Sequence, residues 1–383
     1  MTLNSNSDPA FPYGRTVLVL QGGGALGAYQ AGAYQAIDSA NMNVDWVAGI
    51  SIGAINAAII AGNPPADRVT RLQSFWDTIT HDFNFLPGGD GHHVRLWRNR
   101  SSALGSLVWG VYGFFRPRFP PPMLHPRGSQ EAISFYDTSA LRETLEHFVD
   151  FSLINEGAMR LSLGATNVRT GNFVYFDNAE TELRPEHVMA SGALPPGLPS
   201  VEVDGEYYWD GGVVSNTPLH YVLDQPPDAD TLIFQVDLFS ARGAMPQDIF
   251  EVEERKKDIV YSSRTRLNTD LFHEKHKLRR AILKLRDRMP EELREDPEVR
   301  ELCELGQGDG NEITIVHVIY KRKHYESQSK DYEFSQLSMR EHWQAGYEDT
   351  LNSIRCPEWR APLKNREGLH IFDMQRYIDE ISN

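Results

Sequence analysis

Residues 47–58 read Val47-Ala48-Gly49-Ile50-Ser51-Ile52-Gly53-Ala54-Ile55-Asn56-Ala57-Ala58. The apolar residues at the start are typical of a buried strand, and the small residues at the end are typical of a closely packed helix. Between them lies a G-x-S-x-G pattern, which places a serine on a sharp turn from strand to helix. Flanking glycines let the two elements approach without Cβ collisions. Ser51 would then hold its hydroxyl near the positive end of a helix dipole, as a nucleophile does; a serine that merely caps the helix is the alternative.

The composition is that of a soluble globular protein, with 383 residues of which 40% are hydrophobic and 24% charged. The net charge of −15 argues against nucleic acid as a partner, and it weakens attraction to anionic membranes. Two cysteines, Cys303 and Cys356, are too few for a secreted disulfide framework. The polar segment 1–14 lacks a signal pattern, and no apolar run approaches the roughly 20 residues of a membrane span. We therefore predict a cytoplasmic protein.

A second glycine-rich turn precedes the first one. The apolar segment 16–20 predicts a buried strand, residues 28–39 predict a helix, and between them the chain reads Gln21-Gly22-Gly23-Gly24-Ala25-Leu26-Gly27. This turn fits the G-x-G-x-x-G fingerprint of dinucleotide sites. However, the next strand, residues 46–50, ends at Ser51 and not at the acidic residue that would hold a ribose. What remains is a run of backbone N–H groups that can bind a phosphate or the oxyanion of a tetrahedral intermediate.

Together, the two turns resemble the patatin-like phospholipase family, and three later segments match its motifs. Residues 165–171 fit A-T-x-x-x-T-G, residues 190–195 fit A-S-x-A-x-P, and residues 209–212, Trp-Asp-Gly-Gly, fit the D-G-G/A motif. The resemblance covers about residues 15 to 220. One position departs from the family pattern: Leu26 stands where the family usually carries arginine or lysine, which leans away from a strict phospholipase.

The resemblance implies an α/β fold, a three-layer sandwich around a central, mostly parallel sheet. A flexible tail, residues 1–14, would precede a catalytic domain over residues 15–245. Residues 246–383 would form a mainly helical C-terminal extension, with a strand near residues 313–320, like the extension of a bacterial subgroup of the family.

The resemblance also implies a catalytic dyad of Ser51 and Asp210, working through an acyl-enzyme without a metal or cofactor. Asp210 follows three aromatic residues on a tight turn, a setting that could bury its carboxylate and raise its basicity. The N–H groups of Gly22, Gly23 and Gly24 would hold the oxyanion. Five further glycines would shape the motifs: Gly27, Gly49, Gly53, Gly211 and Gly212.

Two alternatives to the dyad stay open at the sequence level. Asp210 could simply cap its turn, as aspartate before glycine commonly does. A Ser-His-Asp triad could instead use one of the thirteen histidines, none of which lies in a distinctive motif.

The predicted function is hydrolysis of carboxylic esters with lipid-like acyl chains. Hydroxyalkanoate oligomers or other non-phospholipid esters are alternative substrates. A non-catalytic lipid-binding or scaffold protein on the same fold is a second hypothesis, and the intact motif residues argue against it. The oligomeric state is not predicted.

Residues 83–134 differ in character from their surroundings, being rich in proline, glycine, histidine and arginine. They contain an apolar stretch, residues 103–115. As a lid, this stretch would line an acyl pocket or contact a bilayer surface, using Leu107, Trp109, Tyr112, Phe114 and Phe115. As plain structure, it would be a helix packed into the core.

The remaining pattern alternates between helices and strands. We predict an exposed helix over 64–82, further helices over 139–148, 185–191 and 335–352, and strands over 159–165, 172–176 and 231–238. Residues 249–302 are charged and helical, with prolines 290 and 297 as breaks. Their basic stretch, residues 275–280, is typical of a solvated helix face, although it could also meet anionic lipid.

Overall fold

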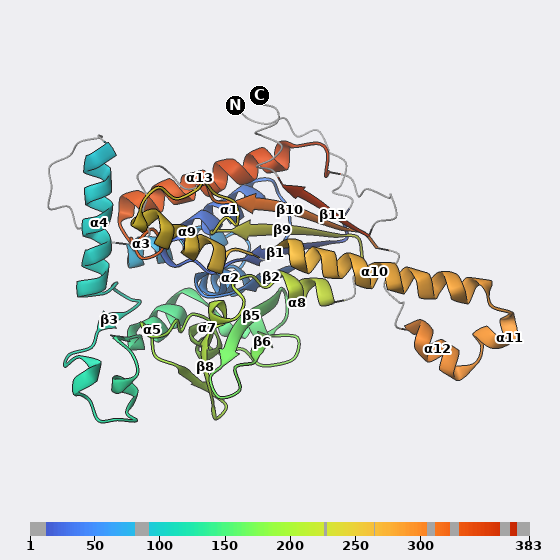
Figure 1. Cartoon of the computed structure of the whole chain (residues 1–383), viewed down its shortest axis with the longest axis horizontal. Helices are drawn as coiled ribbons and strands as arrows, with labels where there is room; N and C mark the ends of the chain where they lie inside the picture. The colour runs from blue at the N-terminus through green and yellow to red at the C-terminus, as the bar shows by residue number, and fades with distance from the viewer. Residues whose placement is uncertain are drawn as a thin grey trace.

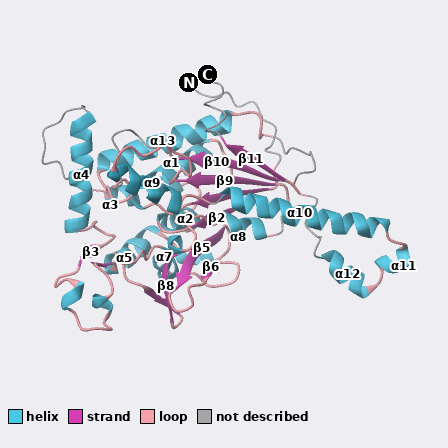
Figure 2. Ribbon diagram, in the orientation of Figure 1, coloured by secondary structure: helices cyan, strands magenta, loops and turns pink. Residues whose placement is uncertain are grey.

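The computed structural model describes residues 13–80, 92–225, 228–263, 265–304, 311–321, 329–360 and 368–373. Its centre is a nine-stranded sheet in the order β11-β10-β9-β1-β2-β5-β8-β7, with β6 paired to β5 (Figures 1 and 2). The parallel strands are β1 (Arg15–Leu20), β2 (Trp46–Gly49), β5 (Arg160–Asn167), β9 (Thr231–Asp237), β10 (Ile313–Ile319) and β11 (Leu369–Asp373). The antiparallel strands are β6 (Phe173–Asp177), β7 (Val201–Val203) and β8 (Glu206–Asp210). The predicted mixed α/β fold with a mostly parallel sheet is confirmed.

The register of the central strands brings the two glycine-rich turns to one edge of the sheet. In β1, Leu20 pairs with Gly49 of β2 on one side and with Val236 of β9 on the other. The carboxyl ends of these three strands therefore lie side by side, and the chain leaves all three at the same edge. In open parallel sheets this edge is where ligands bind.

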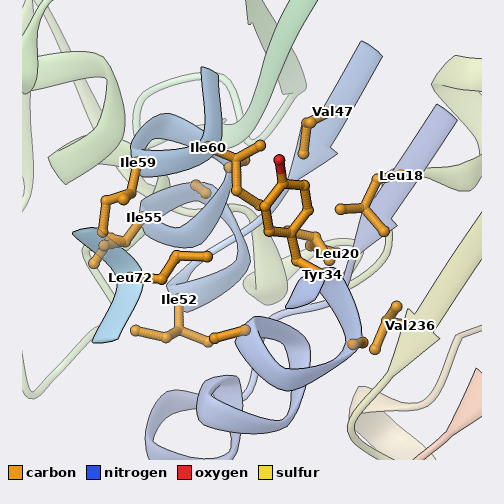
Figure 3. Packing of buried hydrophobic residues seen from close by; sticks show 14 of the residues in the cluster. Leu18, Leu20, Tyr34, Val47, Ile52, Ile55, Ile59, Ile60, Leu72 and Val236 are labelled. Atoms are coloured by element: carbon orange, nitrogen blue, oxygen red, sulfur yellow. The ribbon is translucent and has the colours of Figure 1, made fainter. Parts of the chain in front are cut away.

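Helices cover both faces of the sheet, as the near-continuous apolar strands require. One face packs against α1 (Gly27–Ser39), α2 (Ile52–Ala61) and α13 (Gln336–Arg355). Figure 3 shows this core, where Leu18 and Leu20 of β1 lie near Tyr34 of α1 and Ile60 of α2 lies on the other side of the tyrosine ring. The other face packs against α8 (Leu219–Asp224) and α10 (Thr265–Arg288) through a separate apolar cluster. The result is the predicted three-layer arrangement.

The remaining helices surround this sandwich. They are α3 (Arg68–Ile79), α4 (His92–Trp109), α5 (Ser139–Phe148), α6 (Phe151–Asn155), α7 (Pro185–Ser191), α9 (Ile249–Tyr261), α11 (Glu291–Arg294) and α12 (Pro297–Glu304). Figure 1 shows α4 standing at one end of the molecule, while α10 projects from the other end and leads to α11 and α12. Among the described residues, no helix combines the length and the apolar character that crossing a bilayer would require.

The C-terminal extension is built into the sheet. Strand β10 pairs in parallel with β9, so the expected late strand does join the same sheet, and β11 adds one further strand. Helix α13 lies on α1, where Trp343 donates to Gln35 (2.6 Å) and Tyr29 donates to Asp349 (2.8 Å). Strands from both sides of residue 245 therefore belong to one sheet. The predicted domain boundary at this residue stays a prediction.

One sequence expectation needs correction, one hairpin was missed, and two expected segments lie partly outside the described residues. Helix α3 is not simply exposed, because Leu72, Phe75, Trp76 and Ile79 are buried against the core. Residues 201–210 form the hairpin β7–β8, which was not predicted. The tail segment 1–12 and the first part of the expected lid, residues 83–91, lie outside the described residues.

Candidate active site

Ser51 occupies a strained turn between β2 and α2. Its backbone angles are φ 58° and ψ −126°, a conformation that a residue with a Cβ rarely adopts and that costs on the order of 1–3 kcal/mol. The turn is possible because a Cβ on Gly49 would lie 2.3 Å from the Gly53 carbonyl oxygen, and one on Gly53 would lie 2.5 Å from that of Leu20. Strand and helix are thus packed backbone to backbone, as the motif predicted.

The segment 190–195 holds the turn at Ser51 in place through hydrogen bonds. The N–H of Ser51 donates to the carbonyl oxygen of Ser191 (3.1 Å) and lies 3.2 Å from its hydroxyl. That hydroxyl in turn donates to the carbonyl oxygen of Gly164 in β5 (2.7 Å). The same segment also reaches the aspartate, because the N–H of Asp210 donates to the carbonyl oxygen of Ala193 (2.9 Å). Ser51 and Asp210 are therefore anchored to one short stretch of chain.

Asp210 ends strand β8 and is 1% exposed. Its Oδ1 accepts the N–H of Gly212 (2.7 Å), while the buried Oδ2 has no fully formed hydrogen bond from any described group. Burial raises the pKa of Asp210 to about 6, against the smaller opposing effects of the Ser51 side chain and the Gly212 N–H. Because the Ser51 side chain is one of the groups that lower this pKa, it lies near the carboxyl group. A carboxylate in this state can accept the serine proton near neutral pH.

The first glycine-rich loop lies directly against Ser51. A Cβ on Gly22 would be 3.0 Å from the Ser51 Cβ. The N–H of Gly22, however, donates to the carbonyl oxygen of Asn216 (3.1 Å) and is not available as an oxyanion donor, contrary to the sequence expectation. The N–H groups of Gly23 and Gly24 have no acceptor within the described part of the chain. The candidate oxyanion donors are therefore the N–H groups of Gly23 and Gly24.

The other motif glycines lie in the contacts between elements. Gly27 opens α1 against Ile52 of α2, and Gly211 faces the backbone of Gly164 in β5. Gly212 supplies the N–H that Asp210 accepts.

Two buried amides that sequence reasoning missed hold the loop in place. Asn216 donates from Nδ2 to the carbonyl oxygens of Gly22 (3.0 Å) and Tyr261 (2.9 Å). Gln21 donates to the same Tyr261 carbonyl (3.0 Å), and its Oε1 accepts the N–H groups of Leu238 (2.7 Å) and Phe239 (2.9 Å). Gln21 is a polar residue directly after a buried strand. This position is the sequence signal that could have predicted its role in holding the loop.

Ser51, Asp210 and the loop glycines 22–24 open into one cavity of about 320 Å³. Apart from these polar groups, Asn216 and Asp331, its walls are mostly apolar, and no histidine, lysine or arginine is among the described residues that line it. Of the five predicted lid residues, Leu107, Phe114 and Phe115 line this cavity, whereas Trp109 and Tyr112 do not. These two are 74% and 73% exposed and line a second cavity.

The C-terminal extension supplies part of the wall, which sequence reasoning did not anticipate. Tyr261 at the end of α9 and the segment 331–334 line the cavity. The carbonyl oxygen of Asp331 accepts the N–H of Ala25 in the glycine-rich loop (2.7 Å). The neighbouring Lys330 is buried and pairs with Asp258 of α9 (2.7 Å). The extension therefore both holds the loop and closes one side of the cavity.

Two family profiles match the chain. A profile described as patatin-like phospholipase matches residues 18–223, more than half of the chain. A second, described as patatin phospholipase (DUF3734), matches residues 259–366 in the extension. No curated protein matches the chain significantly.

Two solved structures of larger proteins show a partial likeness to this chain. VipD from Legionella pneumophila is 13% identical with a TM-score of 0.37, covering 89% of this chain and 66% of VipD. ExoU from Pseudomonas aeruginosa, solved in complex with SpcU, is 17% identical with a TM-score of 0.29, covering 63% of this chain and 47% of ExoU. This chain spans less than two thirds of the length of either one. On the family match across both glycine-rich turns and the D-G-G turn, the chain belongs to the patatin-like phospholipase family.

Proposed function

We propose that this protein is a serine hydrolase that cleaves carboxylic esters of lipid-like substrates through a Ser51–Asp210 dyad. The observation that carries the proposal is the fully buried Asp210, whose Oδ2 has no complete hydrogen bond within the described structure, in the same cavity as Ser51. A buried oxygen without a partner is costly, and a serine proton or a substrate-derived proton would satisfy it. The absence of histidine among the described lining residues favours the dyad over the triad.

The reaction follows from these positions. The Ser51 Oγ attacks the ester carbonyl carbon while Asp210 takes the serine proton. The N–H groups of Gly23 and Gly24 stabilise the negative charge that develops on the carbonyl oxygen. Protonated Asp210 then returns its proton to the leaving alcohol, which leaves an acyl-enzyme. Water hydrolyses this ester with Asp210 again acting as base, and the free carboxylic acid departs.

The cavity lining favours an apolar acyl chain as the bound part of the substrate. Its volume is at the lower end of the range for small-molecule sites, and its walls carry aromatic and aliphatic side chains. No cation of the described residues lines it to neutralise a phosphate. Leu26, which replaces the family's usual basic residue, is fully buried and outside the cavity lining. Neutral esters, including acylglycerols and hydroxyalkanoate oligomers, are therefore favoured over phospholipids within the proposal.

Peripheral membrane contact is the second part of the proposal. Among the described side chains of residues 94–135, twelve large apolar ones are exposed, including Trp97, Trp109, Tyr112 and Phe119. Aromatic side chains of this kind partition to bilayer interfaces. This end of the molecule also carries Leu107, which lines the active-site cavity. A cytoplasmic location stays a prediction.

The proposal is tested with a panel of p-nitrophenyl esters, triacylglycerols and phospholipids, the lipids presented both as monomers and in vesicles. We expect hydrolysis of acyl esters and labelling of Ser51 by a fluorophosphonate probe, located by peptide mass mapping. Labelling that persists in Ser51→Ala would refute the nucleophile assignment. A folded protein that takes no label and cleaves no ester would support the non-catalytic alternative.

The raised pKa of Asp210 predicts a distinct pH profile. Because the base must be deprotonated, kcat/KM should fall about tenfold for each pH unit below about 6 and level off above it. An aspartate with its ordinary pKa of 3.8 would keep the enzyme active down to about pH 4. Rates on a short, soluble ester between pH 4.5 and 9 distinguish the two cases, with circular dichroism confirming that the protein stays folded.

A further inference from the structure

A second cavity of about 650 Å³ lies beside the active-site cavity. It is lined by the turn that follows α4 and by one side of α5, and its apolar walls include Trp109, Tyr112 and Phe148. Among the described residues, only Phe115 lines both cavities. Phe115 therefore lies at the boundary between a space that contains Ser51 and a larger space, of mixed polarity, that does not.

The backbone around Phe115 is held in a tight turn. Val111 and Phe115 exchange backbone hydrogen bonds, with the Val111 N–H to the Phe115 oxygen at 2.7 Å and the reverse bond at 3.0 Å. Gly110 and Gly113 within or beside this turn have φ of 80° and 70°. The carbonyl oxygen of Gly113 accepts the Thr144 hydroxyl of α5 (2.7 Å), which fixes the turn to the helix.

The ring of Phe115 is fixed as well. It is 9% exposed and lies edge-on to Tyr136, with ring centroids 4.9 Å apart. Phe334 from the C-terminal extension contacts it from another side, with centroids 6.3 Å apart. Such aromatic pairs stabilise one ring orientation. The side chain therefore behaves as a wall and not as a mobile gate.

We propose that Phe115 sets the upper limit of acyl-chain length, and that the second cavity receives the end of a longer chain once this side chain is made smaller. This inference rests on the proposed hydrolase function, because it assigns the active-site cavity to the acyl chain. The distal methylenes of a long chain are suited to the aromatic side chains of Trp109, Tyr112 and Phe148. The polar groups that also line the second cavity include Arg116, Glu143 and His147.

The test compares Phe115→Ala and the milder Phe115→Leu with the wild type, on p-nitrophenyl esters from acetate to palmitate. We expect the ratio of kcat/KM for palmitate over butyrate to rise at least about tenfold in Phe115→Ala and less in Phe115→Leu. Thr78→Ala, which alters only the second cavity, should leave the wild-type profile unchanged. Ala140→Phe, which fills the second cavity from α5, should cancel the gain when added to Phe115→Ala.

Equal changes across all chain lengths in both Phe115 variants would overturn the inference and assign Phe115 a purely structural role. A gain that Ala140→Phe does not cancel would overturn the assignment of the second cavity.

If the wild type cleaves no ester, the proposed function fails, and a binding experiment then tests whether Phe115 limits the chain length. Calorimetric titration of Ser51→Ala and Ser51→Ala/Phe115→Ala with octanoate and palmitate should then show tighter palmitate binding only in the double variant. Equal palmitate affinities would overturn the inference independently of catalysis.

Discussion

Asp210→Asn should lower ester turnover by about 10²–10⁴-fold while making the folded protein more stable at neutral pH. Asparagine keeps the shape of aspartate, and its oxygen can still accept the Gly212 N–H, but it cannot take the Ser51 proton. Ser51→Ala should cause a comparable loss, because members of one catalytic unit are not additive.

The stability gain follows from the pKa. The folded-state pKa of Asp210, about 6, lies above its ordinary value of 3.8, so the folded protein holds the proton more tightly than the unfolded chain does. This contribution to stability is fully present below pH 4 and is lost as the pH rises through 6. At pH 7 the buried charge costs about 3 kcal/mol, which asparagine would not incur.

A matched control is available in Asp177, another buried aspartate outside the cavity lining. Burial alone would raise the pKa of Asp177, but hydrogen bonds from Arg160 and Ser162 lower it overall. Asp177→Asn should therefore destabilise the fold at pH 7 and leave the activity per folded molecule intact. Denaturant unfolding at pH 7, read with kcat for a short ester, separates the two aspartates.

Two outcomes would contradict the dyad. A well-active Asp210→Asn would remove the aspartate from the role of base. A folded His→Ala variant as inactive as Ser51→Ala would establish a triad with that histidine. Every histidine is therefore replaced in turn, including those outside the described residues.

Gly24→Ala is expected to have the second-largest effect, a loss in kcat of at least the roughly 10²–10³-fold that removing one oxyanion donor causes. Gly24 has φ of 54°, and a Cβ there would lie 2.0 Å from the carbonyl oxygen of Asp331. That oxygen cannot move away freely, because it accepts the Ala25 N–H. The loop must therefore reorganise and displace the N–H groups of Gly23 and Gly24.

The neighbouring glycine provides the control. Gly23 has φ of 174° and ψ of 18°, outside the left-handed region, and the atoms nearest to a Cβ there belong to the Leu238 side chain, the closest at 2.5 Å. The double variant Gly23→Ala/Leu238→Ala removes the closest contact and leaves the Cβ of residue 238 at 3.0 Å, so it should keep both N–H groups near their places and retain more of the turnover than Gly24→Ala. If Gly24→Ala raises KM and leaves kcat unchanged, the loop holds the substrate instead of stabilising the transition state.

The local elements of this fold could be predicted from the sequence because each is specified by neighbouring residues. Helices α5 and α7 and the strands β1 and β10 follow directly from the periodicity of apolar side chains. The hairpin β7–β8 was missed, although Asp204 and Gly205, both with positive φ, form the Asp-Gly turn typical of hairpins. Its strands are short and partly polar, which hid the alternation.

Among the site residues, the sequence determined Ser51 and Asp210 as candidates through the family motifs, and the turn geometry of Ser51 through its glycines. The distance between Ser51 and Asp210 could not be predicted from the sequence. It depends on β8 pairing antiparallel with β5, which places Asp210 beside Ala165 at the sheet edge. Strand order is set by contacts between residues far apart in the chain, which local patterns do not encode.

Only the tertiary structure decided which groups of the site are available and what surrounds them. The Gly22 N–H is occupied by Asn216, nearly two hundred residues away in sequence. The predicted lid residues divide between two cavities, with Phe115 at the boundary. Segment 331–334 closes the active-site cavity because β10 and α13 pack onto the catalytic core on either side of it. Apolar periodicity shows that a side chain will be buried, but the partner that buries it is chosen by the packing of the whole chain.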